Sequence, residues 1–165
     1  MTKRALYDDL RLLAQGLFEG ERDRIANAAN LAAVMWQGLP DLNWAGFYFL
    51  RGDELVLGPF QGRPACVRIA LGKGVCGAAA QSKRTLIVPD VHAFPGHIAC
   101  DTASNSEIVV PLMQDGLVVG VLDLDSPKFN RFDQEDREGL ELLARLWCDS
   151  STHDGGAVDS RTTNS

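Results

Sequence analysis

Two N-terminal segments carry apolar side chains at the spacing of an amphipathic helix. Between Arg4 and about Gly16, and again between Glu21 and about Gly38, apolar residues return every three or four positions. These residues are Leu6, Leu10, Leu13 and Leu17 in or beside the first segment, and Ile25, Ala29, Ala32, Ala33 and Trp36 in the second. The spacing predicts two helices, each with one buried face.

After Pro40 the pattern becomes that of β-strands. Residues 43–50 are rich in aromatic side chains, and residues 54–60 follow after the polar turn Arg51–Asp53, which suits an antiparallel hairpin. Further along we expect a strand over 66–71, a short helix over the small residues 74–81, and a strand over 85–88 that ends at Pro89.

The segment 89–106 has no regular periodicity. It contains two prolines, a glycine, two histidines and a cysteine. A loop of this length in a compact domain is usually functional or disordered. The segment is thus either part of a site or without fixed structure.

The clearest hairpin lies nearer the C-terminus. Two apolar runs, 107–114 and 117–125, flank Asp115–Gly116, a favoured two-residue type I′ turn. A final helix is expected over 133–148, with Asp133 as its N-cap. Its apolar face would carry Leu140, Leu143, Ala144 and Trp147.

This order of elements favours an antiparallel α+β fold with helices covering one face of the sheet. The 165 residues, of which 45% are hydrophobic, can bury one full core but not two. We expect one domain over 1–149, followed by a disordered polar tail over 150–165 that is rich in Ser, Thr, Gly and Asp.

Charge and hydropathy argue against two classes of partner. The net charge is -6 and the longest basic cluster is the pair Lys83–Arg84. The sequence therefore shows no basic patch of the kind that binds nucleic acid or anionic lipid. No apolar run suggests a signal peptide or a membrane span. We therefore expect a cytoplasmic protein, in which reducing conditions leave the four cysteines free to react, to bind metal or to be buried.

The cysteines Cys66, Cys76 and Cys100 lie in three different elements, and Cys148 lies near the end of the last helix. Free cysteines are often simply small buried apolar side chains. A zinc site would have His97 and Cys100, three positions apart, but the set lacks a paired C-x-x-C motif. We expect no metal.

Carboxylates stand in unusual places. Asp123 and Asp125 should point to one face of their strand while Leu122 and Leu124 point to the other. Glu107 opens the partner strand, so three acids could converge on a pocket and there bind an ammonium group and deliver a proton. The alternative is that the strand emerges into water at this end.

Trp44 and Tyr48 should project to one face of the first strand, with Gly46 between them leaving space above the sheet. Such aromatic residues are most often core, and a pocket wall is the alternative. Gly72–Gly77 matches G-x-G-x-x-G, but a dinucleotide site needs parallel βαβ units and an acid about 20 positions on. We interpret it as a tight turn into the short helix.

Together these residues resemble the free methionine-(R)-sulfoxide reductases, small proteins built on a GAF domain. The likeness runs from about Ala5 to Trp147, and the three cysteines at spacings of ten and twenty-four make it specific, because generic GAF modules lack them. Cys148 and the tail are additions. The segments that carry the likeness are 43–49, 58–66, 72–77, 97–101, 106–111 and 120–126.

The resemblance implies a GAF-like sheet of six antiparallel strands covered by the N- and C-terminal helices, and a homodimer. It implies reduction of free methionine-(R)-sulfoxide through a sulfenic acid on Cys100 and a disulfide with Cys66, its main resolving partner, with Cys76 as an accessory or alternative resolving thiol. No bound cofactor is expected; an external dithiol of the thioredoxin kind would reopen the disulfide. The substrate-binding residues would be Trp44, Tyr48, Glu107, Asp123 and Asp125.

Two other functions fit part of the pattern. A non-catalytic GAF sensor would use the same acids and aromatic residues to bind a small ligand. A redox switch would use its disulfide to change association state. The set of three cysteines favours catalysis over both.

Overall fold

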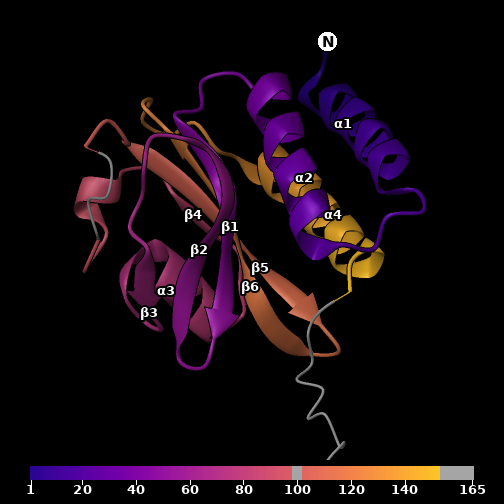
Figure 1. The fold of residues 1–165 in the computed structure, drawn as a ribbon. Coiled ribbons are helices and arrows are strands. Elements are labelled where there is room, and N and C mark those ends of the chain that lie inside the picture. Colours follow the sequence, from indigo (N-terminus) through magenta and orange to yellow (C-terminus); the bar gives the residue numbers. More distant parts are fainter. Residues whose placement is uncertain (98–101, 153–165) are drawn as a thin grey trace, which may run out of the picture.

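The computed structural model describes residues 1–97 and 102–152 (Figure 1). Its centre is a six-stranded sheet of order β3-β2-β1-β6-β5-β4 in which every neighbouring pair is antiparallel. The strands are β1 (Trp44–Arg51), β2 (Glu54–Gly62), β3 (Arg68–Ala70), β4 (Leu86–Val88), β5 (Ser106–Gln114) and β6 (Leu117–Ser126). Both predicted hairpins are therefore present, and the pairing of β1 with β6 joins them.

Helices cover the two faces of the sheet unequally. On one face lie α1 (Lys3–Phe18), α2 (Arg24–Gly38) and α4 (Gln134–Ser150) (Figure 1). On the other face lies the short helix α3 (Gly74–Ser82), with the 3-10 turn η1 (Val91–Ala93) following β4. The predicted antiparallel α+β class is confirmed.

Alternation along the central strands divides the buried side chains into two cores. Even-numbered positions of β5 and β6, such as Ile108 and Leu122, belong to one core with the fully buried Trp147 and with side chains of α2 and α4, over which α1 packs. Odd-numbered positions such as Val109 and Val121 pack against α3. Each strand thus presents one face to each core, as a period of two requires.

Side chains at the helix starts explain two of the boundaries. Asp23 accepts hydrogen bonds from the backbone N–H groups of Ile25 and Ala26, so α2 begins at Arg24, three residues later than expected. Asp133 is the N-cap of α4, as predicted, and forms a reciprocal capping box with Asp136.

The C-terminal helix ends two residues later than expected. It continues to Ser150, the Ser151 side chain is fully buried, and the backbone N–H of Thr152 donates to the carbonyl of Arg22 at 2.8 Å. These bonds tie the end of the helix to the segment before α2. The remainder of the predicted tail, 153–165, lies outside the described residues.

The glycine-rich segment before α3 is a turn. Gly72 and Gly74 have φ values of 80° and 58°, which favour glycine, and an added Cβ on Gly77 would crowd the carbonyl of Ala70. Because the adjoining strands are antiparallel, a dinucleotide-binding βαβ unit is absent from this part of the described chain. Among the described residues, no helix is long and apolar enough to span a bilayer.

Candidate functional site

A pocket lies on the α3 face of the sheet, over the ends of β1, β5 and β6. Its empty volume is about 570 Å³, part of it open to solvent. Its lining residues come from the three strands, from α3, from the segment after β2 and from the segment before β5. They include Trp44, Tyr48, Cys76, Glu107, Asp123 and Asp125.

Two aromatic residues of β1 form one wall. The Trp44 indole stacks between Tyr48 and Phe60, with ring centroids 5.8 and 5.2 Å away. Its Nε1 donates to the carbonyl of Arg63, and the Tyr48 hydroxyl donates to the carbonyl of Cys66. Both side chains are nearly inaccessible and belong to the smaller core, so they are core residues and pocket wall at once.

The space predicted above Gly46 is absent, which corrects that expectation. A Cβ built on Gly46 would overlap Phe60 and would lie 2.9 Å from the carbonyl oxygen of Pro59. The β1–β2 register shifts between Gly46 and Tyr48, and this irregularity brings the β2 backbone over the glycine. Gly46 therefore permits the two strands to approach closely rather than opening the pocket.

The three predicted acids do converge. Glu107 faces Asp125 across the β5–β6 ladder, and Asp123 lies two residues earlier on β6, opposite Gly46. Glu107 and Asp123 are buried, at 5% and 6% exposure, and Asp125 is half-buried at the pocket. The alternative, that this end of the hairpin emerges into water, is wrong for Glu107 and Asp123.

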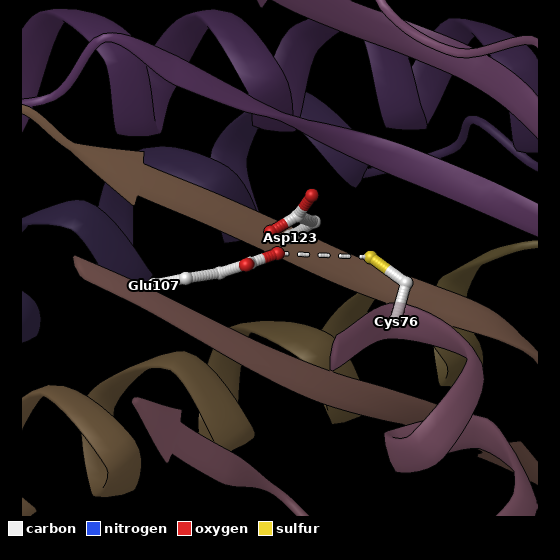
Figure 2. Close-up of side chains that lie close together, drawn as sticks. All are labelled: Cys76, Glu107 and Asp123. Atoms are coloured by element: carbon white, nitrogen blue, oxygen red, sulfur yellow. Dashed lines mark hydrogen bonds between the residues drawn. The ribbon is translucent and has the colours of Figure 1, made fainter. Parts of the chain in front are cut away.

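Cys76 joins this cluster from α3, which packs against the same face of the sheet. It lies in the first turns of α3, and its thiol donates to Oε1 of Glu107 at 3.9 Å (Figure 2). Figure 2 shows the carboxylates of Glu107 and Asp123 side by side, with the Cys76 sulfur directed at them. One oxygen of Asp123, Oδ1, is buried and has no hydrogen-bond partner among the described residues.

Burial sets the protonation of the cluster. It raises the pKa of Glu107 well above its usual range, and the charges of Asp123 and Asp125 raise it further. Burial also raises the pKa of Asp123, although hydrogen bonds within the cluster offset part of this rise. Burial and the neighbouring carboxylates raise the pKa of Cys76. Two buried carboxyl groups so close together favour sharing one proton.

The four cysteines have different environments. Cys76 and Cys148 are free and buried on opposite faces of the sheet. Cys66 is disulfide-bonded, and neither of these two free thiols is its partner. Cys100, the predicted nucleophile, lies outside the described residues.

Several pocket residues were not among the predicted site residues. Lys73 and Val75 flank the turn into α3, and His97 and Ser104 stand on either side of the segment 98–101. Ser104 is buried and accepts a hydrogen bond from the side chain of Asn43 at 3.0 Å. The long aperiodic segment was the signal for His97 and Ser104, but periodicity cannot show which of its side chains turn inward.

One donor set of this site has the composition for a metal ion. The ligand atoms of Cys76, Glu107 and Asp123 all lie within 4.8 Å of one another, and all three residues are buried. The zinc alternative with His97 and Cys100 cannot be placed, because Cys100 lies outside the described residues.

This arrangement is suited to proton transfer in a partly apolar pocket. A carboxyl group whose pKa is raised by burial can act as a general acid, and the indole of Trp44 supplies an apolar surface beside it. The unpaired oxygen of Asp123 can accept a hydrogen bond from a ligand.

Comparison with known proteins gives a consistent family. Residues 27–146 match the model described as GAF domain. The free methionine-R-sulfoxide reductase of Escherichia coli is 52% identical over 147 residues, which cover 88% of this chain and 89% of that protein.

Solved structures agree. That of free methionine-R-sulfoxide reductase from Neisseria meningitidis in complex with its substrate has a TM-score of 0.88 and 45% identity, covering 91% of this chain and 90% of that one. A Burkholderia vietnamiensis protein described as a proposed GAF sensor has a TM-score of 0.89 and 60% identity, covering 92% and 96%. With its GAF domain and its identity to these reductases over most of both chains, this chain belongs to the free methionine-R-sulfoxide reductase family of GAF-domain proteins.

Proposed function

We propose that this protein reduces free methionine-(R)-sulfoxide to methionine. The observation that carries the proposal is the buried pair Glu107 and Asp123 on the floor of a pocket walled by Trp44. A sulfoxide oxygen is a poor leaving group until it is protonated, and this pair holds a proton where that oxygen would bind. The reductases of Escherichia coli and Neisseria meningitidis, similar over most of their length, support the same substrate.

The chemical step uses a sulfur nucleophile and an acid together. The Cys100 thiolate attacks the protonated sulfoxide, the substrate S–O bond breaks, and the oxygen with its proton ends on the cysteine sulfur. The substrate sulfur is thereby reduced and leaves as methionine, while the cysteine is oxidised to a sulfenic acid. Glu107 is the better proton donor of the pair, because burial and two neighbouring carboxylates all favour its protonated form. Asp123 and Asp125 then hold polar groups of the substrate at the pocket.

Recovery of the enzyme requires a second thiol. Cys66 condenses with the sulfenic acid, which releases water and forms a disulfide, and a dithiol such as thioredoxin reduces that disulfide by exchange. The disulfide-bonded state of Cys66 supports this role. Cys76 is an accessory thiol; its burial and its hydrogen bond to Glu107 make it a weaker nucleophile than a free exposed thiolate.

The pocket also explains a preference for the free amino acid. The α-ammonium group of the substrate is positive, and the acids Asp123 and Asp125 give the pocket the opposite charge. A peptide bond removes this ammonium group and leaves the buried Asp123 without that partner, which costs roughly 1–3 kcal/mol. The part of the Trp44 side chain that lines the pocket packs against the methyl group beside the sulfur.

The assembly and location of the protein are two further parts of the proposal. We propose a homodimer and a cytoplasmic location, where thioredoxin-type dithiols keep cysteines reduced. Gel filtration with light scattering tests the first, and fractionation of the producing cells tests the second.

A turnover assay tests the activity directly. The reduced protein is incubated with the R epimer of free methionine sulfoxide and dithiothreitol, with the S epimer and N-acetylmethionine-(R)-sulfoxide as controls. We expect methionine only from the free R epimer. Tight binding of this sulfoxide without turnover would identify a sensor, and a change of association state on oxidation without turnover would identify a redox switch.

A further inference from the structure

Cys76, Glu107 and Asp123 bring one sulfur and two carboxylate donors to a single point. They come from α3, β5 and β6, three elements that the fold fixes against one another (Figure 2). Their ligand atoms lie within 4.8 Å of one another. Because each residue stands on regular secondary structure rather than on a loop, the donors are held in place before any ligand arrives.

One acceptor oxygen of the cluster lacks a hydrogen bond. Oδ1 of Asp123 is buried and has no hydrogen-bond partner among the described residues, and buried acceptors are rarely left in this state. The cluster also lines the open pocket, so a small cation can reach it from solvent. An unpaired buried oxygen beside a thiol and a second carboxyl group points to a positively charged ligand.

The mixture of donors selects the type of cation. Magnesium and calcium prefer sites made of oxygen alone, whereas zinc and cadmium accept cysteine sulfur together with carboxylate oxygen. At the usual zinc bond lengths, a sulfur and an oxygen on one tetrahedral ion lie roughly 3.6 Å apart. The Cys76 sulfur lies 3.9 Å from Oε1 of Glu107 and all three ligand atoms lie within 4.8 Å of one another, so the side chains need only move closer together to hold one ion.

We infer that Cys76, Glu107 and Asp123 form an inhibitory site for a thiophilic divalent cation, zinc above all, inside the substrate pocket. The ion binds one thiolate and two carboxylates and displaces the thiol proton and the proton of the carboxyl pair, with no change of oxidation state. Three protein donors leave one coordination position for water. The bound ion occupies the place of the substrate and removes the proton that activates it.

The metal site itself goes beyond the proposed activity and does not need it, whereas its inhibitory effect rests on the proposed function. Cys76 is a free thiol in the same structure in which Cys66 is disulfide-bonded, so the site does not draw on the Cys66 thiol. Cys148, the other free thiol of the described residues, lies in the opposite core and serves as a matched control.

Cadmium is the probe for the site. Protein carrying the Cys66 disulfide is titrated with Cd²⁺, and the ultraviolet sulfur-to-cadmium charge-transfer band is recorded. We expect one ion per chain, loss of the band in Cys76→Ser, an unchanged band in Cys148→Ser, and affinity lowered about tenfold or more in Glu107→Gln and Asp123→Asn. A band that survives Cys76→Ser, or that disappears in Cys148→Ser, overturns the assignment.

Two measurements on the unmodified chain remain decisive if a variant fails to fold. X-ray absorption of the zinc-loaded protein should show one sulfur and otherwise oxygen neighbours; two or more sulfurs, or none, would refute the site. Free methionine sulfoxide should displace Cd²⁺ competitively, and independence of the two ligands would refute the overlap. If the protein proves to have no reductase activity, the cadmium titration and the X-ray absorption result are unaffected, so the metal site and the proposed activity can fail separately.

Discussion

The hydroxyl of Tyr48 donates a 2.8 Å hydrogen bond to the backbone carbonyl of Cys66. This bond connects the central strand β1 to the segment between β2 and β3 that carries Cys66, the proposed resolving cysteine. Tyr48 is almost fully buried, so the bond is shielded from water. It fixes the position of Cys66 relative to the aromatic wall and the acids.

Replacing Tyr48 by Phe should loosen this connection. We expect Tyr48→Phe to cost about 1 kcal/mol of unfolding free energy, the usual net value of such a bond, and to slow formation of the Cys66 disulfide several-fold. Single-turnover methionine release and thiol loss, followed separately, measure the two steps. The control is Tyr7→Phe, which removes a hydroxyl bonded to Asp136 on the other face of the sheet. It should lower stability without changing disulfide formation; equal effects of the two variants on that step would contradict the argument.

The two redox cysteines should fail in different ways. Cys100→Ser should abolish methionine formation, because no sulfur nucleophile remains to attack the sulfoxide. Cys66→Ser should release about one methionine per chain and then cycle poorly with thioredoxin, since its sulfenic acid lacks the main resolving thiol. Rapid-quench counting of methionine per chain separates these results. Normal turnover by Cys100→Ser would show that the nucleophile is assigned wrongly.

The acid pair should control the chemical step. Glu107→Gln and Asp123→Asn keep the shape of each side chain but remove its proton chemistry, so we expect single-turnover rates to fall by about 10²–10⁴ for Glu107 and by less for Asp123. The wild-type rate should decline as pH rises through the raised pKa of Glu107, because the proton donor is lost there. Unchanged rates in both variants would remove proton delivery from this cluster.

Stability should fall with rising pH because of the same two residues. The folded protein holds protons on Glu107 and Asp123 more tightly than the unfolded chain does. The contribution of these two groups to folding stability is therefore complete below the ordinary carboxyl pKa and is lost as pH rises through their raised pKa values in the folded protein. Thermal unfolding across pH should show this slope in the wild type and a shallower one in Glu107→Gln.

Asp133 should affect stability in the opposite direction of pH, and Asp133→Asn should remove its effect. The pKa of Asp133 is about 2, because hydrogen bonds from Lys3 and the Asp136 backbone outweigh burial, so its stabilising effect is lost only as pH falls from about 4 toward 2.

Two helical glycines should respond in opposite directions to the same substitution. Gly139 of α4 packs against the buried Tyr7 ring of α1, and a Cβ built there overlaps the ring, so Gly139→Ala should destabilise the protein by about 1–3 kcal/mol. Gly16 of α1 has open space around its Cβ position, so Gly16→Ala should stabilise it by about 0.5–1 kcal/mol through helix propensity. Urea unfolding of the two variants provides the comparison. Stabilisation by both would mean that α1 and α4 pack less closely than described.

The period of the strands allowed much of the site to be predicted. Alternation along the strand alone predicted that Asp123 and Asp125 lie on one face of the sheet and Leu122 and Leu124 on the other. The Asp115–Gly116 turn predicted that Glu107 lies on the neighbouring strand beside these acids. The turn works because both of its residues have positive φ, at 52° and 77°. These are local rules, in which neighbours along the chain or across one hairpin determine the result.

Relationships between distant segments could not be predicted in this way. The strand pattern could not show that the β2 backbone would cover Gly46, because a register shift depends on how two strands twist together. Nor could the spacing of cysteines show that Cys76 would meet Glu107, since that contact depends on where α3 packs under the sheet. The identity of the inward side chains in an aperiodic segment, such as Ser104, depends on the same packing.

The division of the sheet into two unequal cores makes the chemistry separable from the scaffold. Trp44, Glu107 and Asp123 point to the thin α3 side, while their immediate neighbours Ala45, Ile108 and Leu122 anchor three helices on the thick side. The residues on the pocket side of each strand can therefore be substituted without changing those that pack against the helices. A library of variants for another small sulfoxide that is confined to the pocket-side positions should retain a high proportion of folded members.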